Sequence, residues 1–444
     1  MPEVLKPTPY SKLIAGEKDS INWTDPGWAA VNIICKTNVG TPLESELVIA
    51  QGMPNPSSKF LWSIPDTLLS YRSRIIIENA NNTTEKIESD IFRIKPYLIT
   101  NLNSDSTYRA YKINRDNFFA PNDSAFQWPF SFYNQFRYRS GIDPFTNMPY
   151  SPLQADSVFS KAFINIHPDW VSWVKTFSTD ACYFSVQNGW YKPSAVLRWD
   201  ASNGLWNGSC FGLAGASAML FENQTRFEAR YPNYPSGFLP ISVTFNNSVR
   251  EVINEIFTYQ FGSPSVPERN NHYKNTTPIM LLNQVKEMLI ADTVEFRTLS
   301  FWNNSGSGGH NLLVYGLKKD AVIDGVYYLQ VYDSNFPMGN TPIQISTLAG
   351  NGFWASTDYP GWGGNKRIIL ETPSDAYYTQ TTFANRNGNQ SPFAVAENEL
   401  QVFTKSGSGV KISDRQGNLT GYVNGQALET IPGSIPLISL NGRE

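Results

Sequence analysis

Residues 1–97 consist of short segments in which apolar and polar positions alternate. The alternation is clearest in SRIIIE and DIFRI, and Pro, Gly and Asn residues separate the segments. A period of two places successive side chains on opposite faces of a strand, so such segments between turn residues are typical of antiparallel sheets. We therefore predict a β-sandwich over 1–97, with strands in WAAVNIICK, ESELVIAQG, KFLWSIP, SYRSRIIIENA and SDIFRIKP.

A helical pattern replaces this alternation between residues 210 and 294. Apolar residues recur every three or four positions in SVREVINEIFTYQFG and in TPIMLLNQVKEMLIAD, and CFGLAGASAMLFEN is compatible with a helix of small residues. This spacing aligns apolar side chains along one face of a helix. Strand patterns return afterwards in VEFRTLSFW, NLLVYGLK, VYYLQVYD and NKRIIL. Helices followed by strands predict an α+β fold, in which a helical lobe packs against an antiparallel sheet.

Two further segments lack a dominant pattern. Residues 98 to about 205 are rich in aromatic residues, and only DWVSWVKTF has a helical stripe. These aromatic side chains either pack beneath a loop-rich lobe or form a stacking surface for a polymer ligand. Near the C-terminus, short strands separated by Gln-Gly-Asn and Asn-Gly turns predict hairpins. The expected domains are therefore a sandwich at 1–97, an α+β domain at 98–373 and a small β-hairpin module at 374–444.

Composition and charge narrow the classes of partner. The net charge is −3 and Lys and Arg are scattered, so we expect no nucleic-acid partner. No apolar run approaches the roughly 18–20 residues that span a bilayer, so no transmembrane segment is expected. Charged residues are 16% and aromatic residues 14%, a balance common in secreted proteins that handle peptides or glycans. We expect a secreted or cell-surface protein whose signal peptide has been removed, with a cytosolic protein as the alternative, because MPEVLKPTPY lacks a signal pattern.

The chain contains only three cysteines, and they differ in context. Cys35 and Cys182 lie in VNIICKTN and DACYFSV, which predicts small buried side chains on strands. Cys210 follows Asn-Gly-Ser at the expected start of a helix, where unpaired N–H groups and the helix dipole favour a thiolate. By itself a cysteine in a helix of small residues is more often a packing residue. Neither paired cysteines nor clustered histidines are present, so we expect no metal site and no cofactor.

One of the three histidines, His310, opens a predicted strand in SGSGGHNLLVYGL, and the next strand ends at Asp333 in VYYLQVYDSNFP. If Leu317 lies opposite Val326 in the hairpin, His310 lies opposite Asp333, with Cβ atoms about 4.5–5.5 Å apart. A turn two residues longer would place Asn335 opposite His310 instead. A slip of one residue would put the partners on opposite faces. Whether His310 lies opposite Asp333 or opposite Asn335, its imidazole gains a partner that orients it, as a general base requires.

The three segments NGSCFGLAGASAML, GGHNLLVYGL and YYLQVYDSNFP together resemble the papain-like cysteine peptidases, in particular the C39-like bacterial branch. The resemblance covers residues 200–340. It implies a papain-like two-lobe domain with a cleft between the helical lobe and the sheet. It also implies that Cys210 is the nucleophile, that His310 is the base that later protonates the leaving amine, and that Asp333, or alternatively Asn335, orients His310.

The resemblance has one departure, just before Cys210. Many relatives have a glutamine about six residues earlier whose side chain helps to stabilise the oxyanion, and here that position is Gly204. We predict that the backbone N–H of Cys210 supplies one donor and that Asn207 supplies the second. In the first domain, KFLWSIP with the strands that follow resembles bacterial extracellular sandwich modules of the immunoglobulin or fibronectin type III kind.

The resemblance implies a cysteine peptidase or amidase that hydrolyses peptide bonds through an acyl-enzyme on Cys210. Its partners would be peptide or protein substrates, including material associated with the cell wall or with glycans. One alternative is a catalytically silent papain-like surface protein that binds peptides or glycans. A transglutaminase is a second alternative, although its histidine usually follows the cysteine at a shorter interval.

Overall fold

A computed structural model describes most of the chain. The described ranges are 2–55, 58–119, 170–188, 208–263, 265–291, 296–305, 308–337, 342–383, 411–423 and 426–432, with a few single residues between them. By their contacts, residues fall into two compact units. The first comprises 1–111 and 286–294, and the second comprises 112–285 and 295–444. Each unit is treated separately below.

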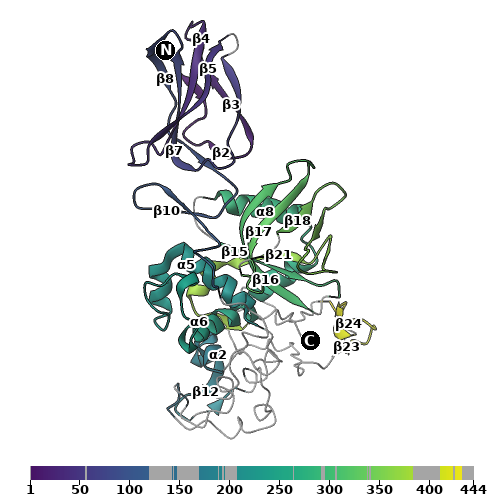
Figure 1. Cartoon of the computed structure of the whole chain (residues 1–444). Coiled ribbons are helices and arrows are strands. Elements are labelled where there is room, and N and C mark those ends of the chain that lie inside the picture. Colours follow the sequence, from purple (N-terminus) through teal and green to yellow (C-terminus); the bar gives the residue numbers. More distant parts are fainter. Residues whose placement is uncertain are drawn as a thin grey trace. The chain divides into compact units, whose positions relative to one another are not determined.

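The core of the first unit is built from two sheets, whose strands are antiparallel except for β2 and β9, which pair in parallel (Figure 1). A three-stranded sheet has the order β1-β3-β6, and a larger sheet has the order β2-β9-β7-β4-β5, with β8 paired to β7. The strand bounds are β1 Val4–Lys6, β2 Lys12–Ile14, β3 Lys18–Trp23, β4 Ala30–Thr37, β5 Ser45–Pro54, β6 Lys59–Ser63, β7 Ser70–Asn79, β8 Asn82–Glu88 and β9 Phe92–Lys95. The two sheets share one hydrophobic core, and each of the five segments predicted to be strands contains a strand.

Strict alternation along β4 explains this core. Every second residue from Val31 to Thr37 is buried, and Cys35 is one of the core side chains, as predicted. Trp62 and Ile64, from the segment KFLWSIP, enter the same core. A further hairpin of β10 (Thr100–Leu102) and β11 (Tyr108–Ala110) belongs to this unit by its contacts, so the unit extends past the predicted boundary at residue 97.

The second unit combines helices with an antiparallel sheet, which confirms the predicted α+β class (Figure 1). Its helices are α2 Trp170–Phe177, α3 Thr179–Cys182, α5 Cys210–Arg230, α6 Asn247–Thr258, α7 Ser265–Tyr273 and α8 Pro278–Ile290, with short 3-10 helices η3 Pro240–Ser242, η4 Tyr259–Phe261 and η5 Ser374–Tyr378. The last residues of α8 group with the first unit. Within the described residues, no helix is both long and apolar enough to cross a bilayer.

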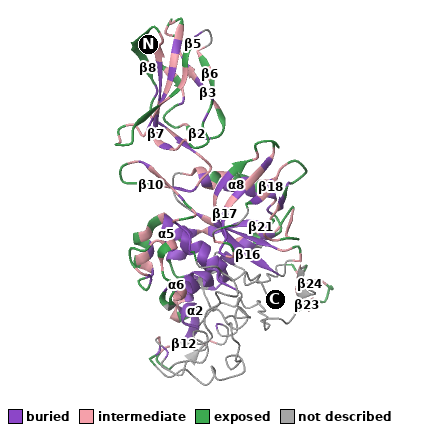
Figure 2. Cartoon of the chain, in the orientation of Figure 1, coloured by how far each residue is buried: buried purple, intermediate pink, exposed green. Residues whose placement is uncertain are grey.

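Seven strands form the main sheet of the second unit, in the order β20-β19-β18-β17-β16-β15-β21. Their bounds are β15 Arg297–Trp302, β16 Gly309–Lys319, β17 Val326–Tyr332, β18 Ile343–Ser346, β19 Phe353–Ala355, β20 Gly363–Gly364 and β21 Ile368–Pro373. All neighbouring strands are antiparallel. Helix α5 packs against β15, β16 and α6, and Figure 2 shows these elements largely buried.

Helix α5 approaches α6 very closely along its small residues. A Cβ atom added to Gly212 would lie 2.2 Å from the backbone oxygen of Ile253, and one added to Gly215 would lie 3.0 Å from the side chain of Ile256. The small residues of 210–218 therefore let two helix backbones meet. The helical dihedral angles are interrupted at Asn223, so α5 consists of two helical segments.

Three smaller sheets complete the second unit. β14 (Gly262–Ser263) pairs with β22 (Thr382–Phe383), and β12 (Tyr183–Ser185) pairs with β13 (Trp190–Tyr191). β23 (Lys411–Ser413), β24 (Leu419–Val423) and β25 (Gln426–Glu429) form an antiparallel meander, which confirms the predicted hairpins. Because η5 and β22 pack onto α5 and β14, residues 374–383 lie with the α+β elements, inside the range predicted for the C-terminal module.

One local prediction was wrong, and one helix was not predicted. Cys182 is buried, as predicted, but it is the last residue of α3 rather than a strand residue. Helix α7 was not predicted, because SVPERNNHY is mostly polar and lacks an apolar stripe. Its polar Arg269 is nevertheless buried, where Nε donates to Glu371 Oε1 at 2.9 Å. A buried ion pair across two elements leaves no periodic signal in the sequence.

The contact between α5 and α6 generates a graded prediction. Gly212→Ala should destabilise the second unit by about 1–3 kcal/mol, because the added methyl group meets a backbone atom that cannot rotate away. Gly215→Ala meets only side-chain atoms and gains helix propensity, so its effect should stay within about 1 kcal/mol. Urea unfolding followed by the helical circular dichroism signal measures both. Equal stability of the two variants would contradict the close approach at Gly212.

Candidate functional site

Cys210 is the first residue of α5, and its side chain is only 3% exposed. The preceding residue, Ser209, is the N-cap but makes no side-chain capping bond to the helix. Its hydroxyl donates instead to Oδ1 of Asn254 on α6, at 3.3 Å. The thiol therefore lies at the positive end of a buried helix, where an anion is stabilised.

His310 and Asp333 form the clearest polar contact near the start of β16. His310 is the second residue of β16, Asp333 follows the end of β17, and both are buried. Nε2 of His310 lies 2.8 Å from Oδ1 of Asp333. Because an ionised carboxylate can only accept, Nε2–H is the donor. The sequence-based pairing of these two residues is present in the structure.

The register that brings them together differs from the prediction. Leu317 lies opposite Leu329, three positions beyond the predicted partner. An odd shift alone would have placed His310 and Asp333 on opposite faces. A bulge between Val314 and Gly316 adds one residue to β16, and the net shift becomes even. Asp333 is thus a diagonal neighbour of His310 on the same face.

Cys210 is also a neighbour of the imidazole, because its charge and a side-chain interaction with it both contribute to the pKa of His310. Burial lowers the pKa of His310, but the charge of Asp333 and then that of Cys210 outweigh it and raise this pKa to about 10. His310 is therefore an imidazolium at neutral pH, and a cation beside a cysteine stabilises its thiolate.

Tyr359, which the sequence did not indicate, holds the other oxygen of Asp333. Its hydroxyl donates to Oδ2 at 2.7 Å, and it accepts from Nδ2 of Asn335 at 3.0 Å. The backbone N–H of Asn335 donates to Oδ1 of Asp333 at 2.8 Å. Asn335, the predicted alternative partner of His310, thus supports Tyr359 and Asp333 instead. Three donors, from His310, Tyr359 and the backbone of Asn335, therefore hold the carboxylate of Asp333 in place.

Aromatic rings surround the imidazole. The ring of Tyr359 lies 5.2 Å from that of His310 and is tilted by 39°, while Phe301 meets His310 edge-on at 5.7 Å. Trp362 extends the cluster, 5.3 Å from Tyr359. These rings exclude water from the ion pair and keep its effective dielectric constant low, so the attraction between the charges is strong. Tyr359 lies in an irregular loop after β19, and no periodic pattern could have indicated it.

Some predicted residues lie outside the described part of the chain. Asn207, the predicted second oxyanion donor, and Gly204 belong to this group, as does much of the aromatic segment 98–205. Within that segment the predicted helix in DWVSWVKTF is present as α2. Among the described residues, no group of three or more His, Cys, Asp and Glu is arranged to hold a metal ion.

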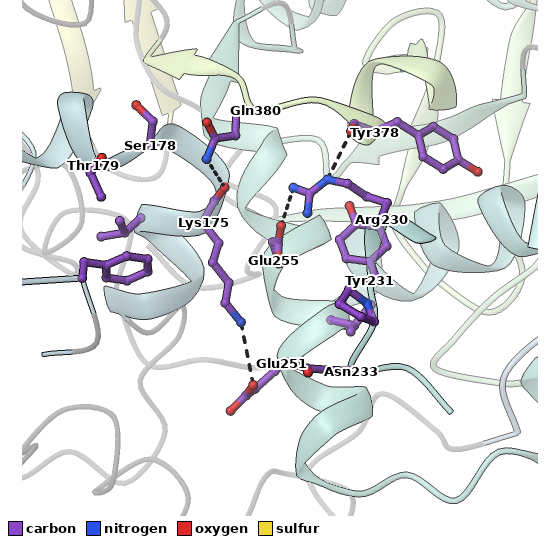
Figure 3. A pocket seen from close by; sticks show the side chains of 14 residues that line it. Lys175, Ser178, Thr179, Arg230, Tyr231, Asn233, Glu251, Glu255, Tyr378 and Gln380 are labelled. Carbon is purple, nitrogen blue, oxygen red and sulfur yellow. Dashed lines mark hydrogen bonds and ion pairs between the residues drawn. The ribbon is translucent and has the colours of Figure 1, made fainter. Parts of the chain in front are cut away.

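A pocket of about 660 Å³ lies elsewhere in the second unit, and none of the three candidate catalytic residues lines it (Figure 3). It is bordered by α2, by the C-terminal end of α5 and by α6. The candidate site lies at the opposite end of α5, where Cys210 begins the helix.

Comparisons with known proteins do not identify the chain. No protein-family model matches it, and no curated protein matches it.

The charge on His310 gives a pH-dependent prediction. The pKa of this histidine is about 10 in the folded protein and near 6.5 when unfolded, so its protonation stabilises the fold fully below pH 6.5. This contribution disappears as the pH rises through 10. Histidine NMR should show His310 as an imidazolium up to pH 9. The His310 signal is identified by its absence from the spectrum of His310→Gln. In Cys210→Ala the midpoint should fall, because one of the charges that raise it is gone. An identical midpoint in both proteins would exclude the contact.

The hydroxyl of Tyr359 can be tested separately from its ring. Tyr359→Phe removes a donor from Asp333, so the carboxylate attracts the imidazolium more strongly and the titration midpoint of His310 should rise. The variant should also lose about 1–2 kcal/mol of stability. Tyr328→Phe is the matched control, because it removes a similar bond to Asp320 at the far end of the hairpin. If both variants leave the His310 midpoint unchanged, Tyr359 has a purely structural role.

Proposed function

We propose that the protein is a cysteine peptidase or amidase that hydrolyses peptide or amide bonds through an acyl-enzyme on Cys210. The observation that carries the proposal is the position of His310, which is hydrogen-bonded to Asp333 and interacts electrostatically with a cysteine at a helix N-terminus. The resemblance of the three surrounding segments to papain-like peptidases of the C39-like branch agrees with this arrangement, and a papain-like domain is part of the proposal.

In the first half of the reaction, the Cys210 thiolate attacks the carbonyl carbon of the substrate. A C–S bond forms, and the carbonyl π electrons move onto oxygen. When this oxyanion collapses, the C–N bond breaks and the leaving amine takes the proton from Nδ1 of His310. Backbone N–H groups at the start of α5 are the candidates to stabilise the oxyanion.

In the second half, water hydrolyses the thioester. His310, now neutral, removes a proton from water as the water oxygen attacks the carbonyl carbon. The C–S bond then breaks, which releases the acid product and restores the thiolate and the imidazolium. Asp333 stays ionised throughout and keeps the imidazole oriented through Nε2. Tyr359 and Asn335 act on Asp333 and are positioning residues.

The proposed substrates are peptides or proteins, and the proposed place of action is outside the cell or at its surface. Few charged residues and many aromatic residues support this location. The β-sandwich of the first unit supports it further, because we interpret that unit as an immunoglobulin or fibronectin type III-like module of an extracellular protein.

One observation favours the alternative of a catalytically silent binding protein. Cys210 is 3% exposed and His310 is 5% exposed, so a substrate carbonyl reaches the sulfur only if the site opens. A protein that retains this ion pair but never exposes it would bind a peptide or glycan without cleaving it. The reactivity of Cys210 separates the two functions.

Alkylation by iodoacetamide at pH 6 tests the nucleophile. Burial raises the pKa of Cys35 to about 12 and that of Cys182 well above its ordinary range, so both serve as unreactive internal controls. We expect modification of Cys210 alone, about 10²-fold faster in the wild type than in His310→Gln, since an ordinary thiol has little thiolate at this pH. Equal rates in the two proteins would refute an activated thiolate.

Turnover of a broad peptide library tests catalysis itself. Cys210→Ala should abolish cleavage, and His310→Gln should lower kcat by about 10²–10⁴-fold. Mass spectrometry of a rapidly quenched reaction should detect the acyl group on Cys210. Slow alkylation of Cys210 together with no cleavage of any library member would instead favour the silent binding protein.

A further inference from the structure

The pocket near the C-terminal end of α5 is enclosed by four parts of the second unit. Its lining includes Val174, Lys175 and Ser178 at the end of α2, Arg230 at the end of α5, and Glu251, Val252 and Glu255 on α6 (Figure 3). Phe145 contributes an aromatic ring. A volume of about 660 Å³ is sufficient for a small organic ligand.

The charges in this pocket balance. Two cations, Lys175 and Arg230, face two carboxylates, Glu251 and Glu255. Arg230 Nη2 and Glu255 Oε1 are 2.5 Å apart, whereas Lys175 Nζ and Glu251 Oε2 are 3.9 Å apart. The second pair is too wide for a hydrogen bond. A ligand with a net charge gains little here, but one that carries both a cation and an anion meets an opposite charge at each end.

Hydrogen-bond donors in the pocket are left unused. The ammonium group of Lys175 makes no hydrogen bond within the described part of the chain. Nη1 of Arg230 makes none there either, because the hydrogen bonds of that guanidinium use Nε and Nη2. Both side chains are partly exposed to the pocket. Two cationic donors of this kind fit a carboxylate, which accepts several charge-assisted hydrogen bonds.

The wall formed by Ser178 has a costly backbone conformation. Ser178 has φ 81° and ψ 160°, a region that is almost restricted to glycine. It is held there because its N–H donates to Val174 O at 2.8 Å and its hydroxyl accepts from Ala181 N at 3.3 Å. The turn between α2 and α3 therefore keeps a fixed shape beside Lys175. Strain of this kind is concentrated at ligand sites.

We propose that this pocket binds a small zwitterion, either a free amino acid or a short peptide with both termini unblocked. Its carboxylate takes the unused donors of Lys175 and Arg230, and its ammonium group takes Glu251. An apolar side chain of this ligand contacts Val174, Val252 and Phe145, which line the same pocket. The site is separate from Cys210, so it does not depend on the proposed peptidase activity.

Isothermal titration of the full-length Cys210→Ala protein tests this site without any hydrolysis. The probes are L-leucine, Leu-Leu, N-acetyl-leucine and leucinamide, so that each charge is removed in turn. We expect leucine or Leu-Leu to bind, and both blocked compounds to bind at least about 10-fold more weakly. The stronger of the first two identifies the ligand as a free amino acid or as a short peptide.

Single substitutions locate the site. Lys175→Met and Glu251→Gln should each weaken binding about 10-fold. Lys318→Met, an exposed charge on β16, is the matched control and should leave binding unchanged. The proposal is overturned if N-acetyl-leucine binds as well as leucine, if Lys175→Met binds normally, or if no heat appears with either zwitterion at millimolar concentration. Because Cys210 is absent, these outcomes are independent of whether the protein is a peptidase.

Discussion

The close approach of α5 to α6 at Gly212 is the constraint on which the second unit depends. With no side chain at this position, the backbone of Ile253 lies against the first turn of α5, immediately after Cys210. The rest of α5 packs on β15 and β16, so the same helix joins the helical elements to the sheet. A bulkier residue at Gly212 would push the helix N-terminus away from α6, and the sulfur would move with it. The small residue that lets α5 pack against α6 therefore also determines where the thiol lies.

The buried charges near His310 are stable only as a set. An isolated imidazolium or carboxylate at these depths would lose its charge, since desolvation is costly. His310 remains charged because Asp333 and Cys210 flank it, and Asp333 is supported in turn by Tyr359 and by the backbone of Asn335. Removing one partner of such a buried pair leaves the other uncompensated, which costs more than the pair contributes.

The sequence predicted those parts of the site that have a local pattern, and it missed those that depend on contacts between distant residues. The helix at Cys210 and the strands that carry His310 and Asp333 have local periodic patterns, so they were predicted. The pairing of His310 with Asp333 was predicted, but the register was wrong, because the partner of Leu317 lies three positions beyond the predicted one and the bulge at Tyr315 reduces this shift only to two. Neither the length of the turn nor the bulge has a strong local pattern in the sequence. Tyr359 was missed because its loop has no periodicity, and the buried contact of Arg269 with Glu371 joins residues far apart in the sequence.

Helix α6 contacts both the pocket and the start of α5. The same two turns of the helix make both contacts, through different faces. Glu251 and Glu255 face the pocket, whereas the backbone of Ile253 contacts Gly212 and the amide of Asn254 accepts from Ser209. Helix α5 is a poorer connection between the two places, because the break at Asn223 separates Arg230 from the segment that begins at Cys210. A ligand that binds Glu251 therefore lies on the same two helical turns that pack against the start of α5. If such a ligand changes the affinity of the cysteine site, linkage requires that occupation of the cysteine site changes the affinity of the pocket by the same factor.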